Sequence, residues 1–249
     1  QLLIQVGGLQ FQEGTNGYTG TEDTFVSSSS ANSSFGNNTS VVVDDFAEHG
    51  ILRFDNMFGS GAGQVAVGST ITNATLSVYV TGTDNFDTVE VYRMLASWSE
   101  ASTWNSLTNG ISANGVEAAS TPLFTVDAGQ SGWVTITGIT STVQDWANGG
   151  TNNGFAFLTG NSDNWTFLSS ENANVTLRPY LTVNFTPPAL PTVDLDANNS
   201  SGATGSDFAG TFTEDGGAVL ISDADATISD ADSTHLESSN AINNCVNKT

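Results

Sequence analysis

The heptapeptide Ala74-Thr75-Leu76-Ser77-Val78-Tyr79-Val80 decides the fold class of this chain. Side chains of an extended strand alternate between two faces, so Leu76, Val78 and Val80 lie on one face and the residues between them on the other. A strand with one apolar and one polar face is typical of an antiparallel sheet that packs on a core from one side only.

Similar short runs, rich in β-branched and aromatic residues, recur on both sides of this heptapeptide. Clusters of Gly, Asn, Asp and Ser separate them and are typical of turns. Regular short strands with such turns predict an all-β protein, a jelly-roll-type β-sandwich. The predicted strands are Val41–Val43, Ile51–Phe54, Thr75–Val80, Thr88–Met94, Trp133–Ile136, Gly154–Leu158, Thr166–Ser169 and Tyr180–Phe185.

One segment, Thr140–Ala147, predicts a helix. Thr140 is a residue type that caps helix N-termini, and Asn148-Gly149-Gly150 provides a stop. Val143 and Trp146 lie one helical turn apart and would bury the same face. We expect a short helix that covers one end of the sandwich.

The chain has 26 acidic residues against four Lys and Arg residues, which gives a formal net charge of −22. This excludes nucleic acids and anionic membrane surfaces as partners, because both are bound by clustered Lys and Arg. No apolar stretch of about 18 residues occurs, so we predict no membrane insertion. Abundant Thr, Ser, Asn and Gly with almost no Lys are typical of a secreted protein, and we expect an extracellular or cell-surface location.

A proline-rich linker, residues 187–192, divides the chain. Such segments stay extended. Residues 1–186 hold most of the aromatic side chains, whereas in residues 193–249 aromatic residues nearly vanish and Asp residues gather in close pairs. We therefore expect one complete β-sandwich domain followed by a second, partial domain.

Short motifs along residues 1–186 carry a family resemblance. They are Leu9–Gly14 with Tyr18, Glu22–Val26, Ile51–Asp55, Ile71–Val80, Val89–Arg93, Trp98–Glu100 with Thr103–Asn105, Val143–Trp146, Asn153–Phe155 and Arg178–Leu181. Together and in this order they resemble the DNRLRE (disaggregatase-related) family, which includes carbohydrate-binding modules of polysaccharide-degrading enzymes. The resemblance implies a jelly-roll sandwich that serves as an accessory module of a larger secreted microbial protein.

The segment after the linker is similar to the start of cadherin-like repeats in bacterial surface proteins. The similarity rests on Val193–Asp196, Phe212–Glu214 and Ile221–Asp232. Such a repeat normally needs more residues than follow the linker, and half a sandwich cannot bury its apolar face. We expect either a truncated chain or a partner that supplies the missing strands.

We predict that the chain is not an enzyme. Ser-His-Asp and Cys-His sites need a histidine near a nucleophile motif, and neither His49 nor His235 has one. The His and Cys clusters of zinc sites are missing as well. Pairs of carboxylates that resemble a glycosidase site would arise by chance in so acidic a chain.

Calcium is the cofactor that the acidic residues favour, because hard cations take carboxylate and carbonyl oxygens. Residues two apart in a strand point the same way, so each close Asp pair places two carboxylates on one face. For the Asp residues of the tail, the alternative is a solvated acidic surface. For Glu22 and Asp23, the alternative is that they belong to a turn at the start of a strand. The candidate ligands are Glu22, Asp23, Asp194, Asp196, Asp223, Asp225, Asp230 and Asp232.

Carbohydrate binding would use flat aromatic rings for the apolar face of a sugar. The loop candidates are Tyr18, Trp104 and Trp165, with core packing as the alternative for Tyr18 and Trp165. The remaining tryptophans, Trp98, Trp133 and Trp146, are expected to pack in the core or under a lid.

The three arginines each lie in or beside a predicted strand. In so acidic a chain we expect Arg53, Arg93 and Arg178 to form internal ion pairs, with Asp55 and Glu90 as candidate partners, rather than to bind a ligand. This disfavours an acidic polysaccharide unless calcium bridges the carboxylates.

The sequence supports two functional hypotheses. The first is a carbohydrate-binding or adhesive module whose partner is a polysaccharide. The second is a structural subunit or spacer of an extracellular filament or surface layer. In that case the apolar segment Leu2–Val6 or the partial second domain would pair with neighbouring protein subunits by self-assembly.

Overall fold

The computed structural model describes residues 7–44, 47–83, 88–160, 164–189 and 191–230. The chain divides into two compact units, Gln1–Pro187 and Pro188–Thr249, here called the first and the second unit. The segment Leu2–Val6, predicted to pair with another subunit, lies outside the described residues. Within the described part, no helix has the length and apolar character needed to cross a membrane.

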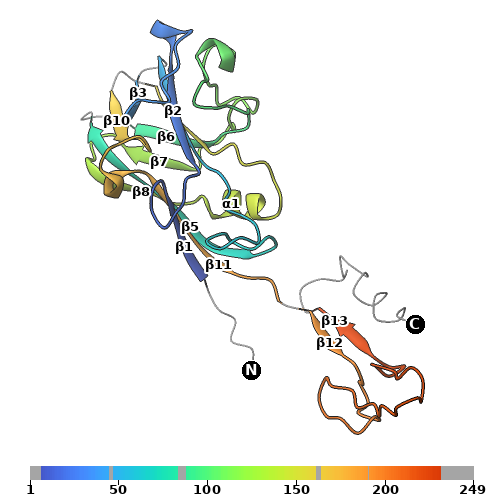
Figure 1. Cartoon of the computed structure of the whole chain (residues 1–249). Helices are drawn as coiled ribbons and strands as arrows, with labels where there is room; N and C mark the ends of the chain where they lie inside the picture. The colour runs from blue at the N-terminus through green and yellow to red at the C-terminus, as the bar shows by residue number, and fades with distance from the viewer. Residues whose placement is uncertain (1–6, 45–46, 84–87, 161–163, 190, 231–249) are drawn as a thin grey trace. The chain divides into compact units, whose positions relative to one another are not determined.

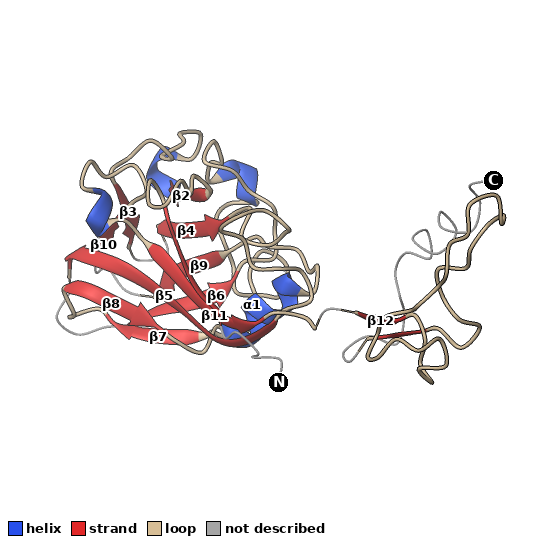
Figure 2. Ribbon diagram, turned by 60° about the horizontal axis from the view of Figure 1, so that its bottom comes forward, coloured by secondary structure: helices blue, strands red, loops and turns tan. Residues whose placement is uncertain are grey.

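The first unit is an all-β sandwich of two antiparallel sheets, as predicted (Figure 1, Figure 2). Sheet A has the order β1 (Gly7–Gln12), β11 (Tyr180–Thr186), β5 (Thr70–Gly82), β10 (Trp165–Leu168) and β3 (Ser40–Val43), with β8 (Gly132–Ile136) also paired to β5. Sheet B has the order β2 (Thr21–Ser27), β4 (Glu48–Phe54), β9 (Phe155–Thr159), β6 (Thr88–Arg93) and β7 (Phe124–Asp127).

The long strand β5 organises sheet A and confirms the alternation seen in the sequence. Leu76, Val78 and Val80 are buried, and Leu76 is paired with Leu181 of β11 and with Ile136 of β8. Strand β8 therefore lies along one edge of β5, and β11 along the other.

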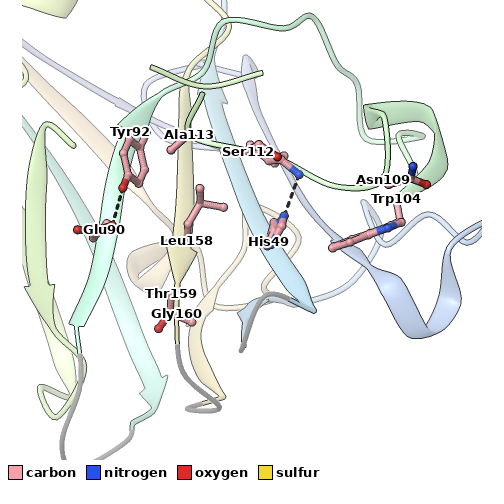
Figure 3. Close-up of a pocket in the computed structure, with 11 residues that line it drawn as sticks. His49, Glu90, Tyr92, Trp104, Asn109, Ser112, Ala113, Leu158, Thr159 and Gly160 are labelled. Carbon is pink, nitrogen blue, oxygen red and sulfur yellow. Dashed lines mark hydrogen bonds between the residues drawn. The ribbon is translucent and has the colours of Figure 1, made fainter. Parts of the chain in front are cut away.

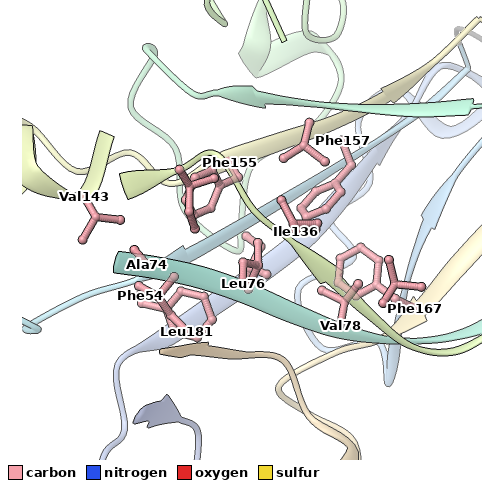
Figure 4. Close-up of a cluster of buried hydrophobic side chains, with 14 of the residues drawn as sticks. Phe54, Ala74, Leu76, Val78, Ile136, Val143, Phe155, Phe157, Phe167 and Leu181 are labelled. Carbon is pink, nitrogen blue, oxygen red and sulfur yellow. The ribbon is translucent and has the colours of Figure 1, made fainter. Parts of the chain in front are cut away.

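The main core fills the space between the two sheets. Figure 4 shows Leu76 and Val78 of sheet A facing Phe155 and Phe157 of sheet B across this core. Burial of each such side chain stabilises the fold by about 1.5–3 kcal/mol.

Every predicted strand forms, within one or two residues at its ends except in β4 and β5, which begin earlier than predicted. Three strands of the first unit, β1, β2 and β7, were not among the predicted runs. Strands β1 and β2 contain Gly or acidic residues that weaken the strand pattern. Short 3₁₀ helices occur at Ser28–Ser30, Asn105–Leu107 and Val175–Leu177.

Helix α1 spans Thr140–Ala147, as predicted, and buries Val143 and Trp146. The capping role expected for Thr140 is wrong, because Ile139 occupies the N-cap position. The Thr140 hydroxyl instead accepts a hydrogen bond from the backbone N–H of Ala74 in β5, at 3.1 Å. This hydrogen bond joins the helix to sheet A through Thr140, the residue that the sequence predicted to cap the helix.

A long segment between β6 and β7, residues 94–123, covers part of the outer face of sheet B. Its apolar side chains form a second core with the outward residues of β2, β4, β6 and β9. The members of this core include Trp98, Leu107 and Ile111 from the segment and Val26, Ile51, Tyr92 and Ala156 from the sheet.

The second unit contains one strand pair in its described part, β12 (Thr192–Asp194) with β13 (Thr227–Ser229). Turns and irregular backbone connect the two strands. Several apolar side chains of this unit are exposed, among them Phe212 and Leu220. The resemblance to a cadherin-like repeat stays a prediction.

Candidate functional site

A pocket of about 600 Å³ opens on the outer face of sheet B (Figure 3). Three neighbouring strands, β4, β9 and β6, provide its floor, and the segment of residues 94–123 provides a wall. The lining residues from the strands are His49, Glu90, Tyr92, Leu158, Thr159 and Gly160, and those from the segment are Trp104, Asn109, Ile111, Ser112 and Ala113.

The floor follows from strand register. Glu90 is paired with Leu158, and His49 precedes the Gly50–Phe157 pair, so His49, Leu158 and Glu90 form one row across three strands. Because side chains alternate along each strand, this row points away from the main core. The sheet therefore presents a ring, an apolar chain and a carboxylate side by side.

Glu90 and Tyr92 form the polar end of the floor. The Tyr92 hydroxyl donates a hydrogen bond to Glu90 Oε2 at 2.5 Å. Burial, together with this bond, raises the pKa of Tyr92 to about 12. At neutral pH the hydroxyl keeps its proton, and the carboxylate oxygens can accept hydrogen bonds from hydroxyl donors.

Trp104 forms the aromatic wall. Its ring lies 4.8 Å from the ring of His49 at an angle of 42°. His49 Nδ1 accepts a hydrogen bond from the backbone N–H of Ile111 at 2.8 Å, which anchors the segment to β4 and requires Nδ1 to be unprotonated. On another side, a Cβ at Gly110 would come within 2.7 Å of the indole, so a glycine is needed there.

Glu90 is the one charged residue among those lining the pocket in the described structure. The arginines are bound elsewhere by oxygens of the chain itself. Arg53 pairs with Glu22 and with Asp55, and lies over the Trp98 ring at 5.0 Å. Arg93 pairs with Asp145. The predicted Arg53–Asp55 pair is confirmed, whereas the described partner of Glu90 is Tyr92 and not an arginine.

The pocket thus offers an aromatic wall, a carboxylate and several hydroxyl or amide groups, with no Lys or Arg among its described lining residues. Residues 15–185, which lie within the first unit, match the model of carbohydrate-binding module family 96. The chain belongs to this family. A carbohydrate is therefore the partner of the family 96 module. A search of curated proteins finds no match to the chain.

The three aromatic residues predicted to bind a ligand have different places in the family 96 module. Trp104 lines the pocket. Tyr18 packs edge-on against Phe11 at 5.2 Å and donates its hydroxyl to the carbonyl oxygen of Asp55, and burial raises the pKa of this hydroxyl. The role of Tyr18 is therefore to stabilise a turn rather than to present its ring to a ligand.

The prediction for Trp165 is wrong. It is fully buried in the main core, in contact with Phe157 and Phe167, and has no ring face open to a sugar. The prediction treated it as a loop residue, but β10 begins at Trp165 and directs this side chain inward.

The structure does not bring Glu22 and Asp23 of the family 96 module together as calcium ligands. Neighbouring residues of a strand point to opposite faces, and Glu22 pairs with Arg53 on one face of β2. Asp23 is 1% exposed, and its Oδ2 accepts a hydrogen bond from the Ser170 N–H at 2.7 Å. Burial and the nearby Glu171 carboxylate raise the pKa of Asp23 well above its ordinary value.

Three of the predicted calcium ligands converge in the second unit. Oxygens of Asp196, Asp223 and Asp225 lie within 4.8 Å of one another. Asp194 is not in this group, and its Oδ1 accepts a hydrogen bond from the Asp196 N–H at 3.1 Å. Asp230 is also not in the group among the described residues, and Asp232 lies outside them.

One exposed aromatic residue was missed. Trp133 was expected to be buried with Trp98 and Trp146, which are indeed buried, but it is 41% exposed on the outer face of sheet A. The signal was present in the sequence, because Val134 and Ile136 alternate with Trp133 and occupy the inward positions.

Proposed function

We propose that the family 96 module binds a neutral glycan in the pocket under Trp104, as a non-catalytic part of an extracellular or cell-surface protein. The observation that carries this proposal is the pairing of an aromatic wall with the Glu90–Tyr92 hydrogen-bond pair, in a pocket whose described lining includes no Lys or Arg. The volume of about 600 Å³ is within the range of about 300–1,000 Å³ usual for small-ligand sites.

The chemistry of a pyranose fits these groups. Its C–H face can contact the Trp104 indole, and its hydroxyls can donate to Glu90 and exchange hydrogen bonds with Asn109 and Ser112. A uronate would bring a second carboxylate toward Glu90 without a Lys or Arg among the described lining residues to compensate it. A neutral sugar is therefore the better ligand.

Titration calorimetry with neutral oligosaccharides (gluco-, manno-, xylo- and galacto-series) tests this proposal. We expect Trp104→Ala to weaken binding by about tenfold or more, through lost stacking area. Glu90→Gln, which keeps the shape, should also weaken binding. Phe212→Ala removes an exposed aromatic ring of the second unit and is the matched control. A parent chain that binds none of these sugars, or variants that bind like the parent, would contradict the proposal.

We also propose calcium binding by the second unit. Hydrogen bonds from the hydroxyl and backbone N–H of Ser201 lower the pKa of Asp196, which keeps this buried side chain ionised. Asp225 Oδ1 is buried and has no hydrogen-bond partner in the described residues. Three carboxylates this close repel one another, and a hard divalent cation would compensate them.

Calcium titration of metal-free protein, followed by thermal melting, tests this second proposal. Bound calcium should raise the melting temperature of the second unit by mass action. Asp225→Asn should remove the effect, whereas Asp215→Asn, an equal charge change at an exposed position of the same unit, should keep it. Equal calcium binding by both variants, or none by the parent, would argue for a solvated acidic surface.

The structural alternative, a spacer or filament subunit that shares strands with neighbouring chains, is favoured by one observation. Phe212, Leu220 and Ile221 of the second unit are all more than half exposed. Exposed apolar residues that gather in one unit are typical of contact surfaces between proteins. Sedimentation of the full chain over a wide concentration range tests it, and a monomer throughout would exclude self-assembly through this unit.

A further inference from the structure

The outer face of sheet A differs in charge from the rest of the molecule. None of the residues of β1, β5, β8 and β11 is Asp, Glu, Lys or Arg, in a chain with 26 acidic residues. The outward positions are filled by Thr, Ser, Asn, Gln and Tyr, by Gly8 and by Trp133. In contrast to the outer face of sheet B, these four strands thus present a broad face that is polar but uncharged.

Trp133 lies at the centre of an aromatic group on this face. Its ring contacts that of Tyr79, its cross-strand partner, at 5.4 Å and 84°. The same ring lies 5.0 Å from the ring of Tyr180, which belongs to β11 on the other edge of β5. The indole must therefore lean from β8 across β5 toward β11.

Ser77 explains how the indole can lie across the sheet. Ser77 is paired with both Thr135 of β8 and Tyr180 of β11, so it occupies the position beneath the leaning ring. Although it points outward, Ser77 is only 2% exposed, which shows that larger side chains cover it. Trp133 itself stays 41% exposed. One side of the aromatic group thus rests on the sheet and the other faces solvent.

Rows of hydrogen-bonding groups lie beside the exposed ring. Strand register places Thr75, Thr182 and Gln10 in one row across β5, β11 and β1, and Asn73 and Asn184 in the next. None of these side chains is fully buried. A flat aromatic ring bordered by rows of hydroxyls and amides fits the apolar face and the hydroxyls of a sugar, and the rows extend along several sugar units.

We propose that this face of sheet A is a second carbohydrate-binding surface, which takes an extended neutral polysaccharide with one pyranose stacked on Trp133. The absence of charge on the four strands selects a neutral chain in an otherwise strongly anionic protein. The rows of hydroxyls and amides across β5, β11 and β1 suit a polymer, whereas the pocket on sheet B encloses a shorter segment. The inference rests on the family and on this face, and does not depend on the pocket.

Binding of the full chain to long neutral polysaccharides tests this inference. The probes are β-1,4-glucan, β-1,4-xylan and β-1,4-mannan, assayed by depletion on the insoluble polymer. We expect Trp133→Ala to weaken binding to at least one polymer by about tenfold, from the loss of the stacked ring, and Trp133→Phe to restore part of it. Because Trp133 is partly exposed, melting temperatures should confirm that both variants stay folded.

Two sets of variants keep this proposal separate from the pocket. Phe212→Ala, in the second unit, should leave binding to the insoluble polymer within about twofold of the parent, while Trp104→Ala should weaken oligosaccharide titration more than Trp133→Ala does. The inference is overturned if Trp133→Ala retains full polymer binding or if the parent binds no polymer. It is also overturned if Trp133→Ala converts a dimer to a monomer without changing polymer binding, because the face would then join two copies of this chain.

Discussion

At the scale of single residues, Asp23 is a buried side chain whose environment disfavours its charge. It lies inside the first unit, and its Oδ1 has no hydrogen-bond partner in the described residues. Burial, the Glu171 carboxylate and, more weakly, that of Glu100 raise its pKa. Burial and the same Glu171 carboxylate also raise the pKa of Glu100.

Linkage gives this raised pKa a definite effect on stability. A carboxyl group whose pKa is higher in the folded state than in the unfolded state binds its proton more tightly when folded. Its stabilising contribution is therefore complete below the unfolded pKa of about 3.9 and is lost as pH rises through the folded pKa. At neutral pH, the buried carboxylate weakens the fold.

We predict that Asp23→Asn raises the free energy of unfolding at neutral pH, by about 1.4 kcal/mol for each unit by which the folded pKa exceeds the unfolded one. The asparagine can still accept the Ser170 N–H bond. At about pH 3 the gain should vanish, since Asp23 is then protonated in both states. Urea unfolding at both pH values measures this. Asp127→Asn, at the exposed end of β7, is the control, and an equal gain there would point to general charge repulsion.

Tryptophan placement shows what the sequence predicts at this scale and what it does not. For Trp165, a shift of one residue in the start of a strand decided between a loop and the core, because side chains alternate with every residue. For Trp133, the alternation with Val134 and Ile136 indicated an outward position. The prediction of burial followed instead from the general preference of tryptophan for the core. The exposure of such a residue depends on which strands flank it, and local sequence does not specify this.

At the scale of elements, the segment of residues 94–123 creates the pocket and was the least predictable part. It contains little regular structure, and its place depends on tertiary contacts such as the bond from Ile111 to His49. The strands and α1 were predictable because their apolar patterns repeat with a fixed period. The convergence of Trp104 with Glu90 and Tyr92 brings together two elements that no local pattern connects.

Gly110 tests whether this segment positions Trp104. Its φ of +95° is unfavourable for other residues, and an added Cβ would meet the Trp104 indole at 2.7 Å. We predict that Gly110→Ala destabilises the first unit by about 1–3 kcal/mol through backbone strain and also weakens oligosaccharide binding, because the ring must move.

Gly115, with φ +85° and no atom within 4 Å of an added Cβ, provides the control. Gly115→Ala should lose stability but keep its affinity. Equal affinity losses in both variants would mean that Trp104 does not depend on Gly110.

At the scale of the whole molecule, the all-β class and the sandwich were predictable, and the distribution of charge over its faces was not. Composition indicated an acidic protein, but only the paired strands reveal that β1, β5, β8 and β11 assemble one uncharged face. Sheet B carries Glu22, Arg53 and Glu90 on its outer side. Such segregation appears only when strands distant in sequence become neighbours.

The net charge of −22 gives the last prediction, which concerns the dependence of binding on salt. Salt shortens the range of electrostatic interactions, from a Debye length of about 10 Å at 0.1 M to about 3 Å at 1 M. A neutral glycan gains and loses no ion pair on binding, so we expect its affinity to change by less than about twofold between about 0.05 M and about 0.5 M NaCl. An acidic polysaccharide such as a polyuronate is repelled by the protein, and any binding should strengthen as salt screens this repulsion. Titration of both polymers across this range, without calcium, measures the difference. An affinity that falls steeply with salt would indicate ion pairs with the ligand and would contradict both glycan proposals, because the arginines of the described structure are already bound by oxygens of the chain.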